Sequence, residues 1–141
     1  MSLVDVSLTL YNHWGVFYIM EEIKTIIIDD VKLIRTELKS LLNPYPNIKV
    51  VGEAAKVQDA IMLVKKENID LVFLDIQLSG QSGFDFLEQV EANLKIIFVS
   101  SFDKYMPQAQ KYNPVDFLMK PIDKKKLDLA IQKVLQNTSV V

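Results

Sequence analysis

The sequence predicts an α/β fold in which five parallel strands form one doubly wound sheet and a helix follows each strand. Short, continuous apolar runs alternate along the chain with segments of helical periodicity, which is typical of buried parallel strands. Four of the runs end in polar residues, at Asp29, Asp75, Ser100 and Lys120. Because parallel strands direct their carboxyl ends toward one edge of the sheet, where ligands bind, these side chains are expected to meet.

Apolar residues run together in five places, which are the expected strands at residues 24–28, 48–54, 70–75, 95–100 and 115–119. Helical periodicity fills the intervals and predicts helices at residues 31–42, 57–67, 84–92, 104–112 and 124–136. A polar loop that contains two glycines, residues 77–83, connects the third strand to the third helix.

The first four helices are each supported by a specific pattern. In the first, one face is expected to carry Leu33, Ile34, Leu38, Leu41 and Leu42. Segment 43–47 should end that helix, because its prolines cannot continue one. The second and third helices are expected to bury Ala60, Ile61 and Val64, and Phe84, Leu87 and Val90. The fourth contains Pro107, which is tolerated in a first turn if Asp103 is the N-cap.

The composition limits the possible functions. A chain of 141 residues suits one domain with a core that needs no cross-links. The net charge of −2 gives no basic surface, so we expect no direct nucleic-acid binding, and we expect no membrane-spanning segment. The absence of cysteine excludes disulfides and thiolate metal sites and fits a cytoplasmic location. The single histidine, His13, excludes a multi-histidine metal centre and is expected in a turn or on the surface.

The first twenty residues differ from the rest of the chain. Apolar and polar residues alternate there with a period of two, and the apolar set is Val4, Val6, Leu8 and Leu10. A turn at residues 12–15 and a second strand at 16–20 would complete a hairpin. Alternatively, the natural start is Met20, and residues 1–19 are a leader or the product of a misplaced start codon. We therefore divide the chain into an N-terminal extension (1–20), a main domain (21–137) and a tail (138–141) that leads toward a further domain.

Four motifs, in this order and spacing, resemble the receiver domains of bacterial two-component response regulators: IIIDD, LVFLDIQLSGQSG, IIFVSSFD and DFLMKPID. The resemblance covers about residues 23–137, and residues 98–123 are most similar to CheY-like receivers that precede LytTR-type DNA-binding domains, the LytR/AlgR class. It implies a flavodoxin-like (βα)5 sheet with the strand order 2-1-3-4-5.

The resemblance assigns a role to each polar strand end. Asp75 matches the phosphoacceptor, because a carboxylate can attack a phosphoryl group to form an acyl phosphate. Three clustered carboxylates raise one another's pKa unless a cation lies among them, and Mg²⁺ prefers oxygen ligands. By analogy Asp30, Asp75 and the backbone carbonyl of Gln77 bind Mg²⁺ directly, and Asp29 acts through water. Lys120 matches the lysine that neutralises a phosphoryl oxygen, and its bond to the following proline is a candidate for a cis peptide.

Ser100 matches the hydroxyl switch of the family, and Phe117 matches its aromatic switch. Two positions depart from the common pattern. Val31 follows the acidic pair where many relatives have Glu, and Ser79 stands in the loop after the phosphoacceptor where many have Pro.

The resemblance implies that a sensor histidine kinase phosphorylates Asp75 and that the change switches an output domain, here a LytTR DNA-binding domain. The chain is then no enzyme for a separate substrate, although it catalyses its own phosphotransfer and autodephosphorylation. Homodimerisation through the fourth helix, fifth strand and fifth helix is expected. One alternative is a pseudo-receiver that binds partners without phosphorylation. Another is a hydrolase of the haloacid dehalogenase type, but that family needs an Asp where Gln77 stands.

Overall fold

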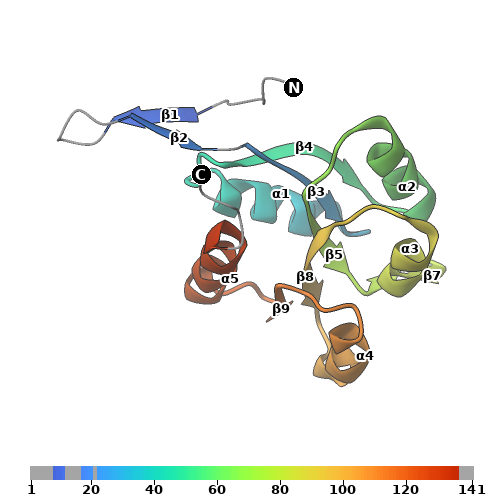
Figure 1. Ribbon diagram of the computed structural model, residues 1–141. Coiled ribbons are helices and arrows are strands. Elements are labelled where there is room, and N and C mark those ends of the chain that lie inside the picture. The colour runs from blue at the N-terminus through green and yellow to red at the C-terminus, as the bar shows by residue number, and fades with distance from the viewer. Residues whose placement is uncertain (1–7, 12–16, 21, 137–141) are drawn as a thin grey trace.

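The computed structural model describes residues 8–11, 17–20 and 22–136, and its centre is a five-stranded parallel sheet (Figure 1). The strands lie in the order β4-β3-β5-β8-β9, which is the predicted order 2-1-3-4-5 when the core strands are numbered along the chain. Their bounds are β3 (Ile23–Ile28), β4 (Ile48–Ala54), β5 (Leu71–Asp75), β8 (Lys95–Ser100) and β9 (Asp116–Met119). The predicted fold class is confirmed.

Helices cover both faces of the sheet, as a doubly wound fold requires. They are α1 (Lys32–Leu42), α2 (Val57–Lys66), α3 (Gly83–Gln89), α4 (Met106–Gln110) and α5 (Lys124–Gln136). One buried cluster joins α1 and α5 to the sheet through Leu38, Leu42, Leu127 and Ala130. The other joins α2, α3 and α4 to the opposite face through Val57, Ala60, Phe84, Phe86 and Ala109. These two layers of helices pack against the sheet on both faces and so position the ends of its strands.

The N-terminal segment forms a two-stranded antiparallel sheet from β1 (Leu8–Tyr11) and β2 (Phe17–Met20), in which Leu8 pairs with Met20. Figure 1 shows this pair projecting from the body of the molecule on the chain that leads into β3. The pairing agrees with the predicted hairpin. The turn that contains His13, and the expected strand residues at 4–7 and 16, lie outside the described residues.

The segment predicted as a loop contains a small antiparallel ribbon, β6 (Gln77–Leu78) with β7 (Gln81–Ser82). Gly80 makes the turn at φ +76°, a conformation that favours glycine. Ser82 then caps α3, because its hydroxyl accepts from the Asp85 backbone N–H while the Asp85 carboxylate accepts from the Ser82 N–H. The loop after Asp75 therefore has regular structure: a short ribbon, a glycine turn and a helix cap.

Three helix predictions need correction. Leu33 is 73% exposed, because it lies about 140° around the helix from Leu38, away from the face that packs on the sheet. The third helix ends at Gln89, since Val90 is already extended at ψ 139° and is only half-buried. The fourth begins with a 3₁₀ turn, η1 (Asp103–Tyr105), whose N-cap is Phe102 rather than Asp103, and the α-helical part has its proline in the first turn.

Candidate functional site

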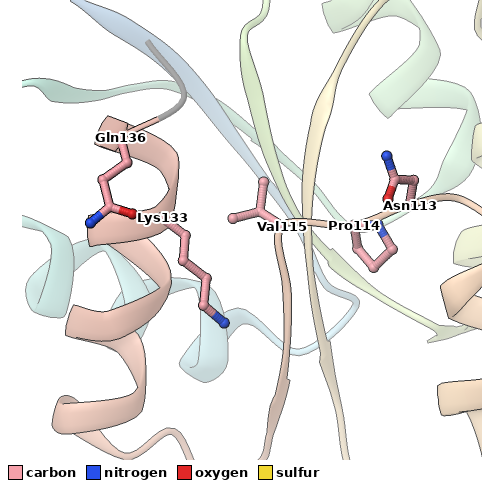
Figure 2. A pocket seen from close by; sticks show the side chains of 5 residues that line it. All are labelled: Asn113, Pro114, Val115, Lys133 and Gln136. Atoms are coloured by element: carbon pink, nitrogen blue, oxygen red, sulfur yellow. The ribbon is translucent and has the colours of Figure 1, made fainter.

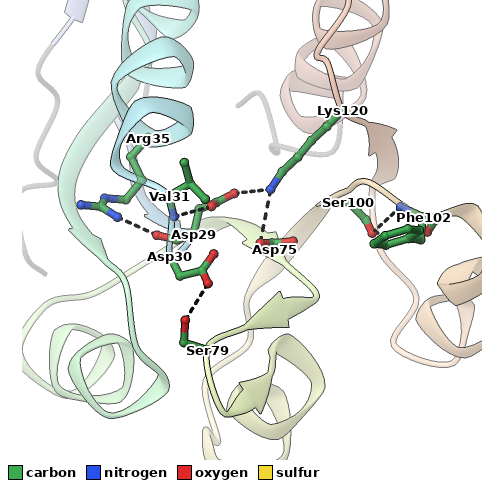
Figure 3. A network of polar contacts seen from close by, with 9 residues as sticks. All are labelled: Asp29, Asp30, Val31, Arg35, Asp75, Ser79, Ser100, Phe102 and Lys120. Atoms are coloured by element: carbon green, nitrogen blue, oxygen red, sulfur yellow. Dashed lines mark hydrogen bonds and ion pairs between the residues drawn. The ribbon is translucent and has the colours of Figure 1, made fainter.

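Three carboxylates meet at the carboxyl edge of the sheet. Asp29 and Asp30 directly follow β3, and Asp75 is the last residue of β5, its neighbour in the sheet. One carboxylate oxygen from each lies within 4.8 Å of the others (Figure 3). The predicted convergence of these residues is confirmed, although the first and last lie far apart in sequence.

Asp29 is 2% exposed, and each of its polar groups has a partner. Its backbone N–H donates to the Ala54 carbonyl at 3.0 Å, and its own carbonyl accepts from Nη1 of Arg35 at 2.7 Å. In the side chain, Oδ1 accepts from the Val31 N–H at 2.9 Å, and Oδ2 contacts Nζ of Lys120 at 2.7 Å. The backbone and the carboxylate of Asp29 are therefore both fixed by contacts within the chain.

Asp30 is less buried than its neighbour, and its Oδ2 accepts a hydrogen bond from the Ser79 hydroxyl at 2.9 Å. Ser79 belongs to the turn between β6 and β7, so this contact ties the acidic pair to the loop that follows Asp75. A proline at position 79 would lack the donor, so this departure from the common family pattern adds a contact in this chain.

Lys120 lies between two of the carboxylates, with Nζ 2.7 Å from Asp29 Oδ2 and 3.3 Å from Asp75 Oδ2. The predicted cis bond joins Lys120 to Pro121, and the Lys120 backbone N–H donates to the Ser100 carbonyl at 2.8 Å. Burial alone would lower the pKa of the Lys120 ammonium. The hydrogen bond to Asp29 and the charge of Asp75 outweigh that effect and raise the pKa. The lysine is therefore a fixed positive charge at neutral pH.

The pKa of Asp75 is raised to about 6, first by burial and then by the negative charge of Asp29, with Lys120 opposing both. One lysine therefore does not neutralise the three carboxylates. Hard oxygen donors close together with excess negative charge fit a divalent cation such as Mg²⁺. Each of the three carboxylates offers one oxygen to a common point, although Asp29 also accepts from the Val31 N–H and contacts Lys120. Which of the three binds a cation directly, and whether Asp29 acts through water, stays a prediction.

The Ser100 hydroxyl is directed away from the acidic cluster. Ser100 is 1% exposed at the end of β8, and its Oγ accepts from the Phe102 N–H at 3.1 Å and donates to the Phe102 carbonyl at 3.3 Å. Figure 3 shows this contact across the site from Asp75. The structure therefore brings Ser100 to the predicted edge of the sheet, but its hydroxyl is hydrogen-bonded to the backbone of the loop that follows.

The ring of Phe117 points into the core. It is 9% exposed, and its centroid lies 6.0 Å from that of Phe98, which continues into contacts with Phe84. The Phe117 side chain therefore belongs to the buried cluster that includes Ala109 of α4 and packs against Tyr105 of η1, and its role as a switch stays a prediction.

Gln77, the proposed carbonyl ligand, lies two residues after Asp75 in β6. Its side-chain amide donates to the Tyr105 hydroxyl at 2.8 Å and so joins the loop after Asp75 to η1. A depression of about 420 Å³ opens beside this contact and includes Ile76, Phe84 and Gln108 among its lining residues. The role of the Gln77 carbonyl in metal binding stays a prediction.

Two residues next to the site were not singled out from the sequence. Gly83 approaches the Asp75 carbonyl so closely that a Cβ at this position would lie 2.3 Å from that oxygen. Arg35 contacts the backbone of Asp29. Gly83 is the last residue of the motif LVFLDIQLSGQSG, so its place in the motif could have marked it as important. Nothing in the sequence distinguishes Arg35 from other charged residues on a helix.

A second depression, of about 250 Å³, lies at the amino end of β9 and is lined by Asn113, Pro114, Val115, Lys133 and Gln136 (Figure 2). It lies at the edge of the sheet opposite the acidic cluster and takes no part in that site. Among the described residues, no helix has the length and apolar character needed to cross a membrane.

Comparison with protein families gives one match over most of the chain. The model described as "Response regulator receiver domain" matches residues 25–132. The chain is 35% identical over 114 residues to the sensory transduction protein LytT of Bacillus anthracis, a match that covers 79% of this chain and 46% of the relative. It is also 35% identical over 119 residues to the transcriptional regulatory protein BtsR of Salmonella typhi, covering 83% of this chain and 50% of the relative. The chain thus spans about half the length of the curated relatives it matches.

Solved structures share the fold. The response regulatory domain of mrkE from Klebsiella pneumoniae superposes with a TM-score of 0.73 at 24% identity, covering 81% of this chain and 95% of that chain. The REC domain of AraT, a response regulator from Geobacillus stearothermophilus, gives 0.71 at 26% identity and covers 80% and 92%.

Proposed function

This chain belongs to the response regulator receiver family, and from that premise we propose that Asp75 accepts a phosphoryl group from a sensor histidine kinase. The observation that carries the proposal is the meeting of Asp29, Asp30 and Asp75 with Lys120 at one edge of the sheet. An isolated strand-end aspartate would be explained as a loop cap, but an acidic triad with two buried members and one lysine calls for a cationic ligand and a charged substrate group.

In the proposed reaction, a carboxylate oxygen of Asp75 attacks the phosphorus of a phosphohistidine. A P–O bond forms, the P–N bond breaks, and the imidazole nitrogen leaves with the electron pair. With a pKa of about 6, the Asp75 carboxyl is mostly ionised at neutral pH and is ready to attack. Later attack of water on the acyl phosphate releases inorganic phosphate, so the chain catalyses its own phosphorylation and dephosphorylation and turns over no separate substrate.

Lys120 supplies a positive charge to an equatorial phosphoryl oxygen, since its ammonium already lies 3.3 Å from Asp75 Oδ2. A Mg²⁺ ion held by Asp30, Asp75 and the Gln77 carbonyl, with Asp29 contributing through water, would neutralise the remaining charge of the phosphoryl group in the transition state. Asp29 keeps Lys120 in place through the 2.7 Å contact.

The response to phosphorylation involves Ser100 and Phe117. The new phosphoryl group brings a charge of roughly −1.5 to −2 and three acceptor oxygens. We propose that the Ser100 hydroxyl leaves Phe102 to donate to one of these oxygens. The loop and η1 then move, together with Phe117 beneath them, and this shifts an existing equilibrium between two conformations.

The similarity to LytT and BtsR extends the proposal beyond this chain. Because those relatives are about twice as long, we propose that the receiver controls an attached output domain of the LytTR type, and that any DNA contact belongs to that domain. We place a homodimer contact on α4, β9 and α5. Asp116 of β9 is already paired with Lys133 of α5 at 3.0 Å within the chain, so a dimer contact through Asp116 would have to replace that pair.

The test is the intact mass of the chain after incubation with acetyl phosphate and Mg²⁺. We expect the parent chain and Asp59→Asn, an exposed aspartate on α2, to gain one phosphoryl group, and Asp75→Asn to gain none. If the parent chain gains no mass under conditions that label another receiver, the phosphoacceptor function is wrong and the chain is a pseudo-receiver. Labelling of Asp75→Asn would move the acceptor to another residue.

A further inference from the structure

Arg35 connects the acidic pair to the edge strand of the sheet. It projects from α1, and its side chain is 13% exposed. Nη1 donates to the Asp29 carbonyl at 2.7 Å, and Nε donates to Glu53 Oε1 of β4 at 2.6 Å. Figure 3 shows the guanidinium against the backbone of Asp29, on the side away from Lys120. Arg35 therefore touches no oxygen of the carboxylate cluster.

The carbonyl that Arg35 contacts belongs to the peptide that joins Asp29 to Asp30. A peptide unit is planar, so holding its oxygen also fixes the direction of the bond that enters Asp30. On the other side of Asp29, the N–H donates to Ala54. The backbone is thus held at both peptides of Asp29, and the direction in which Asp30 presents its carboxylate depends on the second of them.

Glu53 keeps the guanidinium in that position. Its carboxylate accepts from Nε of Arg35 and also contacts Nζ of Lys39, which lies one helical turn further along α1. The hydrogen bonds from Lys39 and Arg35 lower the pKa of Glu53, which is therefore ionised at neutral pH. A guanidinium holds its N–H groups in a rigid plane and can serve two acceptors at once, which the single ammonium of lysine does less well.

We infer that Arg35, anchored by Glu53, is a positioning residue that orients the Asp29–Asp30 pair for a divalent cation. The inference rests on the proposed function, because it requires the acidic cluster to bind Mg²⁺. Groups that hold metal ligands in place without touching the metal commonly change its affinity 10- to 100-fold when they are removed.

If Arg35 acted only through its charge, removing it would change the affinity for Mg²⁺ in the opposite direction. A positive guanidinium close to the cluster repels a cation, so removing it would strengthen Mg²⁺ binding. Positioning predicts weaker binding instead. Lys39 offers a matched comparison, because it pairs with the same glutamate and carries the same charge but has no recorded contact with Asp29.

The experiment is a calorimetric titration of Mg²⁺ into the parent chain and the variants Arg35→Gln, Arg35→Lys and Lys39→Gln. We expect both Arg35 variants to bind Mg²⁺ about tenfold more weakly and Lys39→Gln to stay within about twofold of the parent. Arg35→Lys keeps the charge, so a loss in that variant comes from the lost geometry. Binding in Arg35→Gln that equals or exceeds that of the parent overturns the inference.

Circular dichroism on each variant shows whether it is folded. If the Arg35 variants are not, Glu53→Asp takes their place, because it keeps the charge but withdraws the anchor by one methylene, and the same loss is expected. The two proposals can fail separately. A parent chain that binds no Mg²⁺ overturns both, whereas a parent that binds Mg²⁺ with unchanged Arg35 variants overturns the positioning role alone.

Discussion

The hydroxyl of Ser100 is bound to the backbone of Phe102 through both of its hydrogen-bonding functions. It accepts from the Phe102 N–H at 3.1 Å and donates to the Phe102 carbonyl at 3.3 Å. Because the side chain is 1% exposed, water does not replace these contacts when they break. In the proposed switch, a phosphoryl group on Asp75 would have to offer Ser100 a stronger acceptor than the Phe102 carbonyl, and a charged oxygen is one.

Replacing Ser100 with Ala should separate phosphorylation from its consequence. We expect Ser100→Ala to be phosphorylated by acetyl phosphate but to show much smaller amide shifts in residues 102–110 on phosphorylation, since the hydroxyl that pulls on the loop is gone. NMR spectra before and after phosphorylation measure this. Ser101→Ala, at the exposed neighbouring position, should respond like the parent. Full-sized shifts in Ser100→Ala would remove Ser100 from the switch.

Lys120 is expected to act on the transition state more than on the fold. Lys120→Gln removes the positive charge that pairs with Asp75, and loss of one preorganised donor to a developing charge typically costs about 10²–10³ in rate. We expect the labelling rate at saturating Mg²⁺ to fall by that factor. Lys124→Gln, on the exposed first turn of α5, is the matched control and should label at the parent rate. Equal rates for both variants would contradict the role of Lys120.

The raised pKa of Asp75 predicts a pH-dependent cost in stability. In the folded, metal-free chain this carboxyl titrates near pH 6 instead of 3.8, so the folded state binds its proton more tightly than the unfolded state does. The associated stability is present below about pH 4 and is lost as the pH rises through 6, by roughly 3 kcal/mol. Asp75→Asn has no such titration. Urea unfolding should therefore find Asp75→Asn more stable than the parent at pH 7.5, with the difference shrinking toward pH 4.5.

Asp59→Asn is the control for that experiment, because an exposed carboxylate on α2 should give little difference at either pH. Addition of Mg²⁺ should stabilise the parent chain more than Asp75→Asn, since a ligand that binds only the folded state adds to its stability. A difference between parent and Asp75→Asn that stays constant with pH would contradict the raised pKa.

The fold and the main site residues could be predicted because they depend on patterns along the chain. Asp75 and Lys120 follow apolar strands, and the sheet geometry alone brings such strand ends together. The contact of Arg35 with the Asp29 carbonyl could not be predicted in this way. It joins a side chain to a backbone oxygen, and any residue can supply that oxygen.

Some details of side-chain packing also could not be predicted from the sequence. Leu33 fits a loose helical pattern, but the exact helical angle carries it away from the sheet. The direction of the Ser100 hydroxyl depends on the local loop conformation rather than on residue type. The β6–β7 ribbon is too short for periodicity to reveal it, since each strand has two residues. In each case the missing information lies in three-dimensional contacts of single residues.

A side chain at Gly83 is expected to affect both the stability of the fold and the position of Asp75. Replacing a glycine within a helix by alanine usually stabilises the protein by roughly 0.5–1 kcal/mol. Here the added Cβ would lie 2.3 Å from the Asp75 backbone oxygen, so the strand end has to move. We expect Gly83→Ala to lower the free energy of unfolding by about 2 kcal/mol or more and to slow labelling of Asp75. Gly80→Ala meets no atom within 4 Å, and its cost of about 1 kcal/mol should come from the positive φ alone, with labelling unchanged. Urea unfolding and labelling rates on both variants test this, and a Gly83→Ala chain as stable and reactive as the parent would show that the close approach has no effect.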